Sequence, residues 1–509
     1  MAKGKQTKAK SARGQTEATG EVLDLKAAAE FLKVSKPTFY RWLAQGKIKG
    51  SKAGTQWRFY RGDLENFMHS AEPSALQVDA GSLRQAVDAA RKAMRLPRID
   101  WEKPGPFGME ASTEASEERT VVRVAETIMA GAIEGRASDI HIDMESDRTW
   151  VRYRVDGVLN EVMSLPKEAG RPIVSRLKLM SDLDLSEHRV PQNGRIRVSY
   201  QDREYDFRTA TFPAVFGESM VMRILDQASV LIGMDKLGLS KRTQGAFERA
   251  LRLPQGLIIV SGPAGSGRTT TLYSALNLIN SPQKKMVSIE DPVEYQLKGI
   301  MQMHVNRKAG LTFDIGVRYF VRGDPDIILV GDLRDQATAE TCMTAALTGH
   351  LVLTAMLPPT APEVITRLLD MGLEPFVVGA SVRAVLAQRL VRKVCPHCKT
   401  VHQIGAEARK RLENQTDMDL SGAKFQRGPG CAECYGYGFR GRTAVFELME
   451  VTDELRELIV RRASAAEIRE AAVEAGMTTL LKDGVEKATQ GITTVEEVLR
   501  VLSVSQVGH

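Results

Sequence analysis

A glycine-rich segment carries the clearest chemistry in the chain. Gly262-Pro-Ala-Gly-Ser-Gly-Arg-Thr-Thr270 follows an apolar run, 257–260, and precedes a helical run that begins at Thr271. A strand, a glycine-rich turn and a helix N-terminus in this order form a phosphate-binding loop, because converging N–H groups face phosphate oxygens. The candidate nucleotide-contacting residues are Gly262, Pro263, Ala264, Gly265, Ser266, Gly267, Arg268, Thr269 and Thr270.

Arg268 stands where such loops ordinarily carry lysine. It keeps the positive charge, but its planar guanidinium is wider than an ammonium group, and the two are not interchangeable at a tight phosphate site. The loop therefore predicts nucleotide binding, and the arginine raises the question of whether the nucleotide is turned over.

Carboxylates follow two further apolar runs. The run 286–289 ends in Glu290, and the run 327–330 is followed by Gly331 and Asp332. Ligand sites of α/β domains lie at the carboxyl ends of strands. Asp332 and the Thr269 hydroxyl are placed to bind Mg²⁺ beside ATP. An acid at a strand end is also a common helix cap, but two of them downstream of a phosphate-binding loop indicate a nucleotide site.

Two C-x-x-C pairs predict a metal site. The pairs are Cys395 with Cys398 and Cys431 with Cys434. Four thiolates brought together match the closed tetrahedral site of structural Zn²⁺. A redox pair is the weaker reading, because the pairs are matched and lack a thioredoxin-like context. Cys342 lies in an apolar helical run and is most simply a core residue.

Composition indicates a globular protein of several domains. The 509 residues are 43% hydrophobic and 26% charged, and 70 basic against 63 acidic residues give a net charge of +7, which permits anionic partners without proving them. The basic N-terminus lacks the apolar core of a secretory signal, and no apolar run reaches the ~18–20 residues of a membrane span.

We expect an α/β multidomain fold with six segments. These are a basic tail (1–20), a winged helix-turn-helix (21–70), a linker around a helix at 82–94 (71–118), an α+β domain (119–228), a RecA-like P-loop NTPase domain (229–394), and a zinc module with C-terminal helices (395–509).

Residues 21–70 predict helices at 24–32 and 36–43, followed by a basic wing. This pattern resembles the winged helix-turn-helix of the excisionase and MerR-type DNA-binding families. The resemblance implies that the second helix faces the major groove and that the wing contacts phosphates. Such a module also serves as a protein-binding adaptor. The candidate DNA-contacting residues are Lys36, Thr38, Tyr40, Arg41, Lys52 and Arg58.

From about residue 120 to beyond 500, ordered motifs resemble the secretion ATPase superfamily, in particular the type II secretion and type IV pilus assembly ATPases. Three motifs follow the phosphate-binding loop: Glu290-Asp-Pro-Val-Glu-Tyr295, Asp324-Pro-Asp-Ile-Ile-Leu-Val-Gly-Asp-Leu-Arg-Asp335 and Thr348-Gly-His-Leu-Val-Leu353. Four precede it: Ala137-Ser-Asp-Ile-His-Ile142, Arg152-Tyr-Arg-Val-Asp-Gly157, Arg189-Val-Pro-Gln-Asn-Gly-Arg195 and Asp206-Phe-Arg208.

The resemblance implies a homo-hexameric ring with ATP held between the α+β domain and the motor domain. Arg189, Arg195 and Arg208 match arginines that approach the phosphates, although each alone is as consistent with a salt bridge. Glu290 matches the residue that polarises the attacking water, and His350 begins the family's histidine motif. Catalytic roles thus fall on Glu290, Asp332, His350, Arg195 and Arg208. Cytoplasmic location at the inner membrane, through secretion or pilus platform proteins, is also implied.

Three positions depart from the family pattern. Arg268 replaces lysine, Asp332 replaces glutamate, and Leu357 stands where a second histidine belongs. Phosphoryl transfer depends on positioning and charge stabilisation, so these changes predict ATP binding with weakened or lost hydrolysis. The alternative is a nucleotide-sensing regulator or scaffold, built on a degenerate motor, that acts through DNA or a protein partner.

Overall fold

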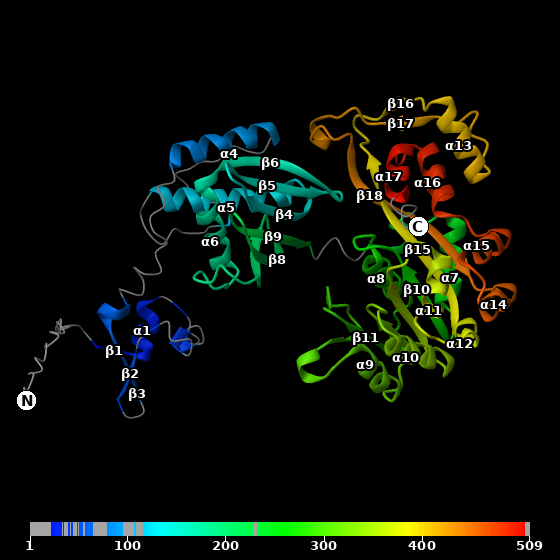
Figure 1. Cartoon of the computed structure of the whole chain (residues 1–509), viewed down its shortest axis with the longest axis horizontal. Helices are drawn as coiled ribbons and strands as arrows, with labels where there is room; N and C mark the ends of the chain where they lie inside the picture. The colour runs from blue at the N-terminus through cyan, green and yellow to red at the C-terminus, as the bar shows by residue number, and fades with distance from the viewer. Residues whose placement is uncertain are drawn as a thin grey trace, which may run out of the picture.

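Figure 1 shows the computed structural model of the chain, which describes residues 22–32, 34, 39–40, 42–43, 48, 50–53, 56–64, 79–94, 106–107, 116–226 and 232–503. Three sheets of three, six and seven strands and a two-stranded ribbon organise these residues. Within these ranges no helix combines the length and the apolar character needed to cross a membrane.

The N-terminal sheet is small and antiparallel, in the order β1-β3-β2. Its elements are β1 (Val22–Asp24), α1 (Leu25–Phe31), β2 (Ser51–Ala53) and β3 (Gln56–Tyr60). The first expected helix is confirmed as α1, and Asp24 caps it by accepting the Ala27 N–H at 2.8 Å. Phe39 and Phe59 meet edge to face in the core, with ring centroids 5.0 Å apart. Half of the second expected helix, residues 36–38 and 41, lies outside the described residues, and its other four residues are helical.

The six-stranded sheet is antiparallel, in the order β6-β5-β4-β9-β8-β7. One face is apolar: Ile140 and Ile142 of β4 pair with Met222 and Met220 of β9, and all four are buried in the core that the helices complete. The elements are α4 (Ala80–Met94), α5 (Ser116–Glu134), β4 (Ala137–Met144), β5 (Arg148–Val155), β6 (Val158–Pro166), α6 (Gly170–Met180), β7 (Gln192–Tyr200), β8 (Arg203–Ala214) and β9 (Gly217–Asp226).

The helix expected in the linker is confirmed as α4, but it does not stand apart from the next domain. Leu83 and Val87 are fully buried in the same core as Ile128 of α5. Because residues four apart lie on one face of a helix, these side chains form an apolar stripe that needs a partner surface. Residues 80–94 therefore pack with the middle sheet (Figure 1).

The seven-stranded sheet has the order β12-β11-β13-β14-β10-β15-β18, parallel except for β18. All residues of β10, β13 and β14 are buried, as expected for central strands covered on both faces. The strands are β10 (Gly256–Ser261), β11 (Met286–Glu290), β12 (Ile300–His304), β13 (Ile327–Val330), β14 (Leu351–Met356), β15 (Val382–Val394) and β18 (Phe439–Glu450). The covering helices are α7 (Lys241–Leu251), α8 (Arg268–Ile279), α9 (Phe313–Val321), α10 (Gln336–Leu347), α11 (Ala361–Asp370) and α12 (Pro375–Ser381).

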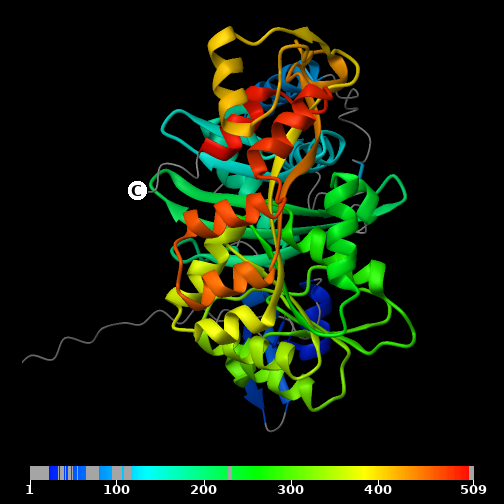
Figure 2. The same cartoon turned by 90° about the vertical axis from the view of Figure 1, so that its right-hand side faces the viewer.

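The C-terminal segment returns to the seven-stranded sheet. Strand β18 lies beyond the expected division at residue 394, yet it pairs with β15 from Ala384↔Glu450 to Val394↔Phe439. Figure 2 shows these two strands running side by side along this part of the molecule. The remaining elements are β16 (Thr400–His402), α13 (Ala406–Thr416), β17 (Phe425–Arg427), α14 (Asp453–Val460), α15 (Ala465–Glu474), α16 (Leu480–Thr489) and α17 (Val495–Ser503).

Candidate functional site

The glycine-rich segment forms a tight turn between β10 and α8, as its sequence predicts. Gly262 and Gly267 have φ of 149° and 91°, values that glycine adopts readily and other residues rarely do. A Cβ atom on Gly262 would lie 2.5 Å from the carbonyl oxygen of Gln388 on β15. Sequence reasoning missed Gln388, because β15 carries several polar residues and nothing in its sequence distinguishes this one. Helix α8 begins at Arg268, so its N-terminal N–H groups adjoin the loop.

The Arg268 side chain extends toward the carboxyl ends of β13 and β14. Its Nη1 donates to the carbonyl oxygen of Met356 at 2.7 Å and lies 3.8 Å from Oδ1 of Asp332. Burial lowers the pKa of this guanidinium, and the nearby carboxylate of Asp332 opposes that effect. The cation at the lysine position is therefore engaged with β14 and with the acid after β13.

Asp332 lies between two arginines. Its Oδ2 accepts Nε of Arg334 at 2.7 Å, and this bond raises the pKa of the Arg334 guanidinium. Its Oδ1 is buried and accepts no hydrogen bond within the described part of the chain. A buried carboxylate oxygen without a donor fits the oxygen-donor chemistry of a Mg²⁺ site, and Thr269, in the first turn of α8, carries a hydroxyl of the same chemistry.

Glu290 ends β11 and is almost fully buried. Its Oε2 accepts the Tyr273 hydroxyl at 2.5 Å, and its Oε1 accepts Ser288 Oγ at 2.6 Å and Gln302 Nε2 at 3.2 Å. Burial and, next, the bond to Glu290 raise the pKa of Tyr273. These three donors fix the carboxylate, and sequence reasoning identified none of them. Tyr273 and Gln302 come from other elements, α8 and β12, and Ser288 lies two residues before Glu290 on β11.

Strand order determines which candidate residues meet. The carboxyl ends of β11, β13 and β10 place Glu290, Asp332 and the glycine-rich loop along one edge of the parallel sheet. His350 precedes β14 and therefore lies at the opposite edge, about 20 Å away along a strand of this length. There its Nδ1 lies 2.9 Å from the carbonyl oxygen of Ala345. Leu357, which follows β14, is the residue of this motif beside the loop.

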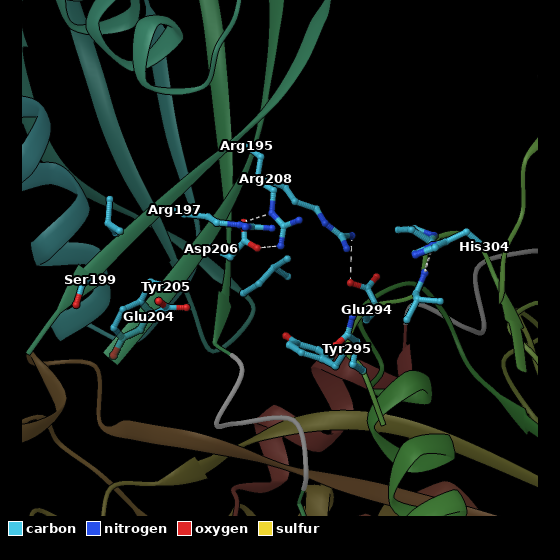
Figure 3. A pocket seen from close by; sticks show the side chains of 15 residues that line it. Arg195, Arg197, Ser199, Glu204, Tyr205, Asp206, Arg208, Glu294, Tyr295 and His304 are labelled. Carbon is cyan, nitrogen blue, oxygen red and sulfur yellow. Dashed lines mark hydrogen bonds and ion pairs between the residues drawn. The ribbon is translucent and has the colours of Figure 1, made fainter. Parts of the chain in front are cut away.

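Two of the three candidate arginines face a cavity between the middle sheet and the segment after Glu290. The cavity has a volume of about 950 Å³. Figure 3 shows Arg208 of β8 directed across it to Glu294, with Nη1 and Oε2 3.1 Å apart. Arg195 of β7 binds Asp206, with Nε and Oδ1 2.5 Å apart. Residues 262–270 do not line this cavity.

Arg189 does not line the cavity, and its side chain is 87% exposed. It binds Glu187 through two hydrogen bonds, with Nε–Oε1 and Nη2–Oε2 separations of 3.1 and 2.8 Å. These bonds lower the pKa of Glu187 to about 2. The salt-bridge alternative therefore describes Arg189 in this structure.

The four paired cysteines converge at the start of β18. Their sulfur atoms all lie within 4.8 Å of one another, and Cys395–Cys431 and Cys398–Cys434 are each 3.8 Å apart. A tetrahedral zinc with bonds of about 2.3 Å requires sulfur separations of about 3.8 Å, so the cluster fits Zn²⁺. Burial raises the pKa of the Cys434 thiol, but N–H groups of Cys431 and Gly438 outweigh it and lower that pKa to about 7. Cys342 is fully buried in the core, as expected.

The structure describes half of the candidate DNA-contacting residues. Tyr40, Lys52 on β2 and Arg58 on β3 are exposed. The Lys52 ammonium lies 5.9 Å from the centre of the Trp57 ring. Lys36, Thr38 and Arg41 lie outside the described residues.

Comparison with known proteins defines the class. Residues 114–500 match the family described as type II/IV secretion system protein, and residues 22–71 match one described as helix-turn-helix domain. The chain therefore belongs to the type II/IV secretion system protein family.

Individual relatives are close. Over 403 residues the chain is 42% identical to the type IV pilus assembly ATPase PilB of Myxococcus xanthus, covering 79% of this chain and 71% of PilB. Over 443 residues it is 38% identical to the type II secretion system protein E of Pseudomonas aeruginosa, covering 86% of both.

Solved structures share the fold. The pilus retraction motor PilT with bound ADP has a TM-score of 0.50 at 24% identity, covering 74% of this chain and 95% of PilT. The ATPase DotB of Legionella pneumophila has a TM-score of 0.56 at 17% identity, covering 78% and 98%.

Proposed function

We propose that this protein is an ATP-binding subunit of a secretion or pilus-assembly ATPase ring in which hydrolysis is slow. Its relatives are secretion and pilus-assembly ATPases, which favours a motor over the regulator alternative. Nucleotide binding is supported by the glycine geometry at Gly262 and Gly267 and by the adjoining N-terminus of α8.

The contacts of Arg268 carry the proposal of slow hydrolysis. To reach a phosphate, the guanidinium has to leave the Met356 carbonyl and the Asp332 carboxylate, and its fork then has to fit a loop built for an ammonium group. The other two departures act in the same direction. Asp332 is one methylene shorter than glutamate, and Leu357 offers no donor where the family has a second histidine.

The remaining residues have defined roles in this proposal. Asp332 and Thr269 would hold Mg²⁺, which neutralises phosphate charge when bound. Glu290, held by Tyr273, would orient the attacking water. Arg195 and Arg208 would exchange their present carboxylate partners for phosphate oxygens, since a guanidinium pairs bidentately with either.

Steady-state phosphate release tests the proposal. We expect the unmodified protein to bind ATP or ADP but to release phosphate slowly, and Arg268→Lys to raise the rate at least about 10-fold. Arg252→Lys, a matched change at an exposed helix C-terminus, serves as the control. Fast Mg²⁺-dependent turnover by the unmodified protein, abolished by Glu290→Gln, would contradict slow hydrolysis.

The family relationship also supports proposals about assembly. We propose a homo-hexamer that acts in the cytoplasm, peripheral to the inner membrane, through secretion or pilus platform proteins. We further propose one structural Zn²⁺ held by the four paired cysteines, because their sulfur separations match such a site.

We propose that residues 21–70 bind duplex DNA, supported by the helix-turn-helix match and by the exposed Lys52 and Arg58. Binding by the full chain should weaken steeply with salt, because basic side chains release counterions. Lys52→Ala should lower affinity for all sequences about equally, and Arg41→Ala should reduce sequence preference. Lys92→Ala, at an exposed position of α4, is the charge-matched control. No binding at low ionic strength would indicate a protein-binding adaptor instead.

A further inference from the structure

Gln388 is a buried polar side chain that touches the glycine-rich loop from a neighbouring strand. Ser261, the last residue of β10, pairs with Ala387 of β15, so Gln388 lies beside the first turn of the loop. Its side-chain Nε2 donates to the carbonyl oxygen of Ser266 at 2.7 Å, and its Oε1 accepts the Thr271 hydroxyl at 2.8 Å. Both ends of the amide are thus used, one on the loop and one on α8.

We propose that Gln388 is a positioning residue that sets the loop in its phosphate-binding conformation before nucleotide arrives. The inference rests on the proposed binding of nucleotide at residues 262–270. In a trans peptide the carbonyl of one residue and the N–H of the next point in opposite directions. The hydrogen bond between the Ser266 carbonyl and Gln388 therefore turns the Gly267 N–H away from β15. In that direction the N–H can donate to a phosphate oxygen.

The fit of the loop against Gln388 is close on two sides. A Cβ atom on Gly267 would lie 3.1 Å from Nε2 of Gln388, and one on Gly262 would lie 2.5 Å from its carbonyl oxygen. Arg389 Nη1 donates to that same carbonyl oxygen at 2.9 Å, which fixes the backbone against which the loop packs. The loop is therefore shaped by this position of β15 as well as by its own glycines.

Only glutamine supplies this pair of bonds at this length. Glutamate lacks the donor for Ser266, methionine has neither group, and asparagine is one methylene shorter. Gln388 is 1% exposed, so water does not replace a lost bond at low cost. A loop held in its bound conformation loses less conformational entropy on binding, so Gln388 should increase nucleotide affinity.

The test measures the affinity of the full-length chain for fluorescent mant-ADP, together with the unfolding temperature without nucleotide. We expect Gln388→Met to weaken affinity about 10-fold or more, from two lost bonds. Thr271→Val should weaken it less, and Thr271→Ser should retain it. Thr493→Val is the control, because it removes the hydrogen bond of another buried threonine, to the carbonyl oxygen of Arg392 further along β15.

A merely structural role would lower the unfolding temperature of Gln388→Met, as for Thr493→Val, and leave affinity unchanged in folded protein. That result would overturn the inference while the proposed function stands. If Gln388→Met does not fold, Thr271→Val against Thr271→Ser decides: equal affinities would contradict the inference. Absence of binding by the unmodified chain would overturn the proposed function, and the role of Gln388 with it.

Discussion

Strand β15 joins two regions of the molecule that differ in how completely their chemistry is retained. Gln388, within the strand, packs against the glycine-rich loop, and Cys395, immediately after the strand, belongs to the cysteine cluster. At the cysteine cluster all four sulfur atoms are present at separations that suit zinc. At the loop the glycine frame is present, whereas Arg268, Asp332 and Leu357 are the positions at which we propose that hydrolysis is weakened.

The difference follows from which atoms each function uses. A structural zinc site is made of side chains, so losing one ligand removes the function. Phosphate binding by a glycine-rich loop uses backbone N–H groups and tolerates changes in the side chains. Hydrolysis depends on precisely placed side chains and does not tolerate changes in those side chains. Nucleotide binding at the loop is therefore compatible with the slow hydrolysis that we propose.

The largest expected effect lies at the cysteine cluster. Cys431→Ser should reduce the bound zinc from about one per chain to near zero and should make residues 395–450 sensitive to proteolysis. Because metal binding supplies folding free energy in such modules, we expect a loss of several kcal/mol. Elemental analysis and limited proteolysis measure the two effects. Cys342→Ala, a buried cysteine outside the cluster, should keep its zinc. A zinc-free unmodified protein, purified without chelators, would contradict the zinc assignment.

The next effect lies at the loop. Gly262→Ala places a Cβ atom 2.5 Å from a backbone oxygen at a φ of 149°, so neither partner can easily give way. We expect nucleotide affinity to fall about 100-fold. Zinc content should not change. Gly422→Ala is the control, because a Cβ atom there would meet open space. Equal affinities of the two variants would show that the loop does not contact the nucleotide closely.

The elements that carry this site could be predicted from short runs of sequence. The run at 327–330 is confirmed as β13, and the runs before Gly262 and at 286–289 as β10 and β11. Each of these strands and helices can be assigned from sequence, because the hydrophobic pattern that distinguishes a strand from a helix lies within the run itself. Strand order then brings Glu290 and Asp332 to the loop edge, as expected for carboxyl ends of parallel strands.

What the sequence did not reveal depends on contacts between distant segments. Gln388 lies 122 residues from Ser266, and no local pattern connects them. His350 and Leu357 belong to one sequence motif, but β14 lies between them. His350 therefore lies at the end of β14 that is opposite to the glycine-rich loop. The domain boundary expected at residue 394 separates β18 from the sheet to which it belongs. Strand β18 pairs with β15 although the cysteine module lies between them in the chain, so no local pattern reveals the pairing.

The smallest expected effect lies where helix α17 forms a salt bridge with the last residues of β15. Glu497 is almost fully buried, and it accepts Arg392 Nη2 at 2.8 Å and Arg500 Nε at 2.8 Å. Burial raises the pKa of this carboxyl, but the bonds to Arg500 and Arg392 outweigh burial and lower the pKa to about 2, from an ordinary 4.5. The folded state therefore favours the carboxylate.

A carboxyl whose pKa is lower in the folded state stabilises the protein above the unfolded pKa, and this contribution is lost as the pH falls from about 5 toward 2. Part of the network is solvent-exposed, since the Arg500 side chain is 52% exposed, so we expect no more than about 1–2 kcal/mol. Glu497→Gln should lower the unfolding temperature at pH 7 and flatten its fall below pH 5. Glu496→Gln, at the exposed neighbour, is the control. If both variants unfold alike at every pH, α17 does not hold β15 through this carboxylate.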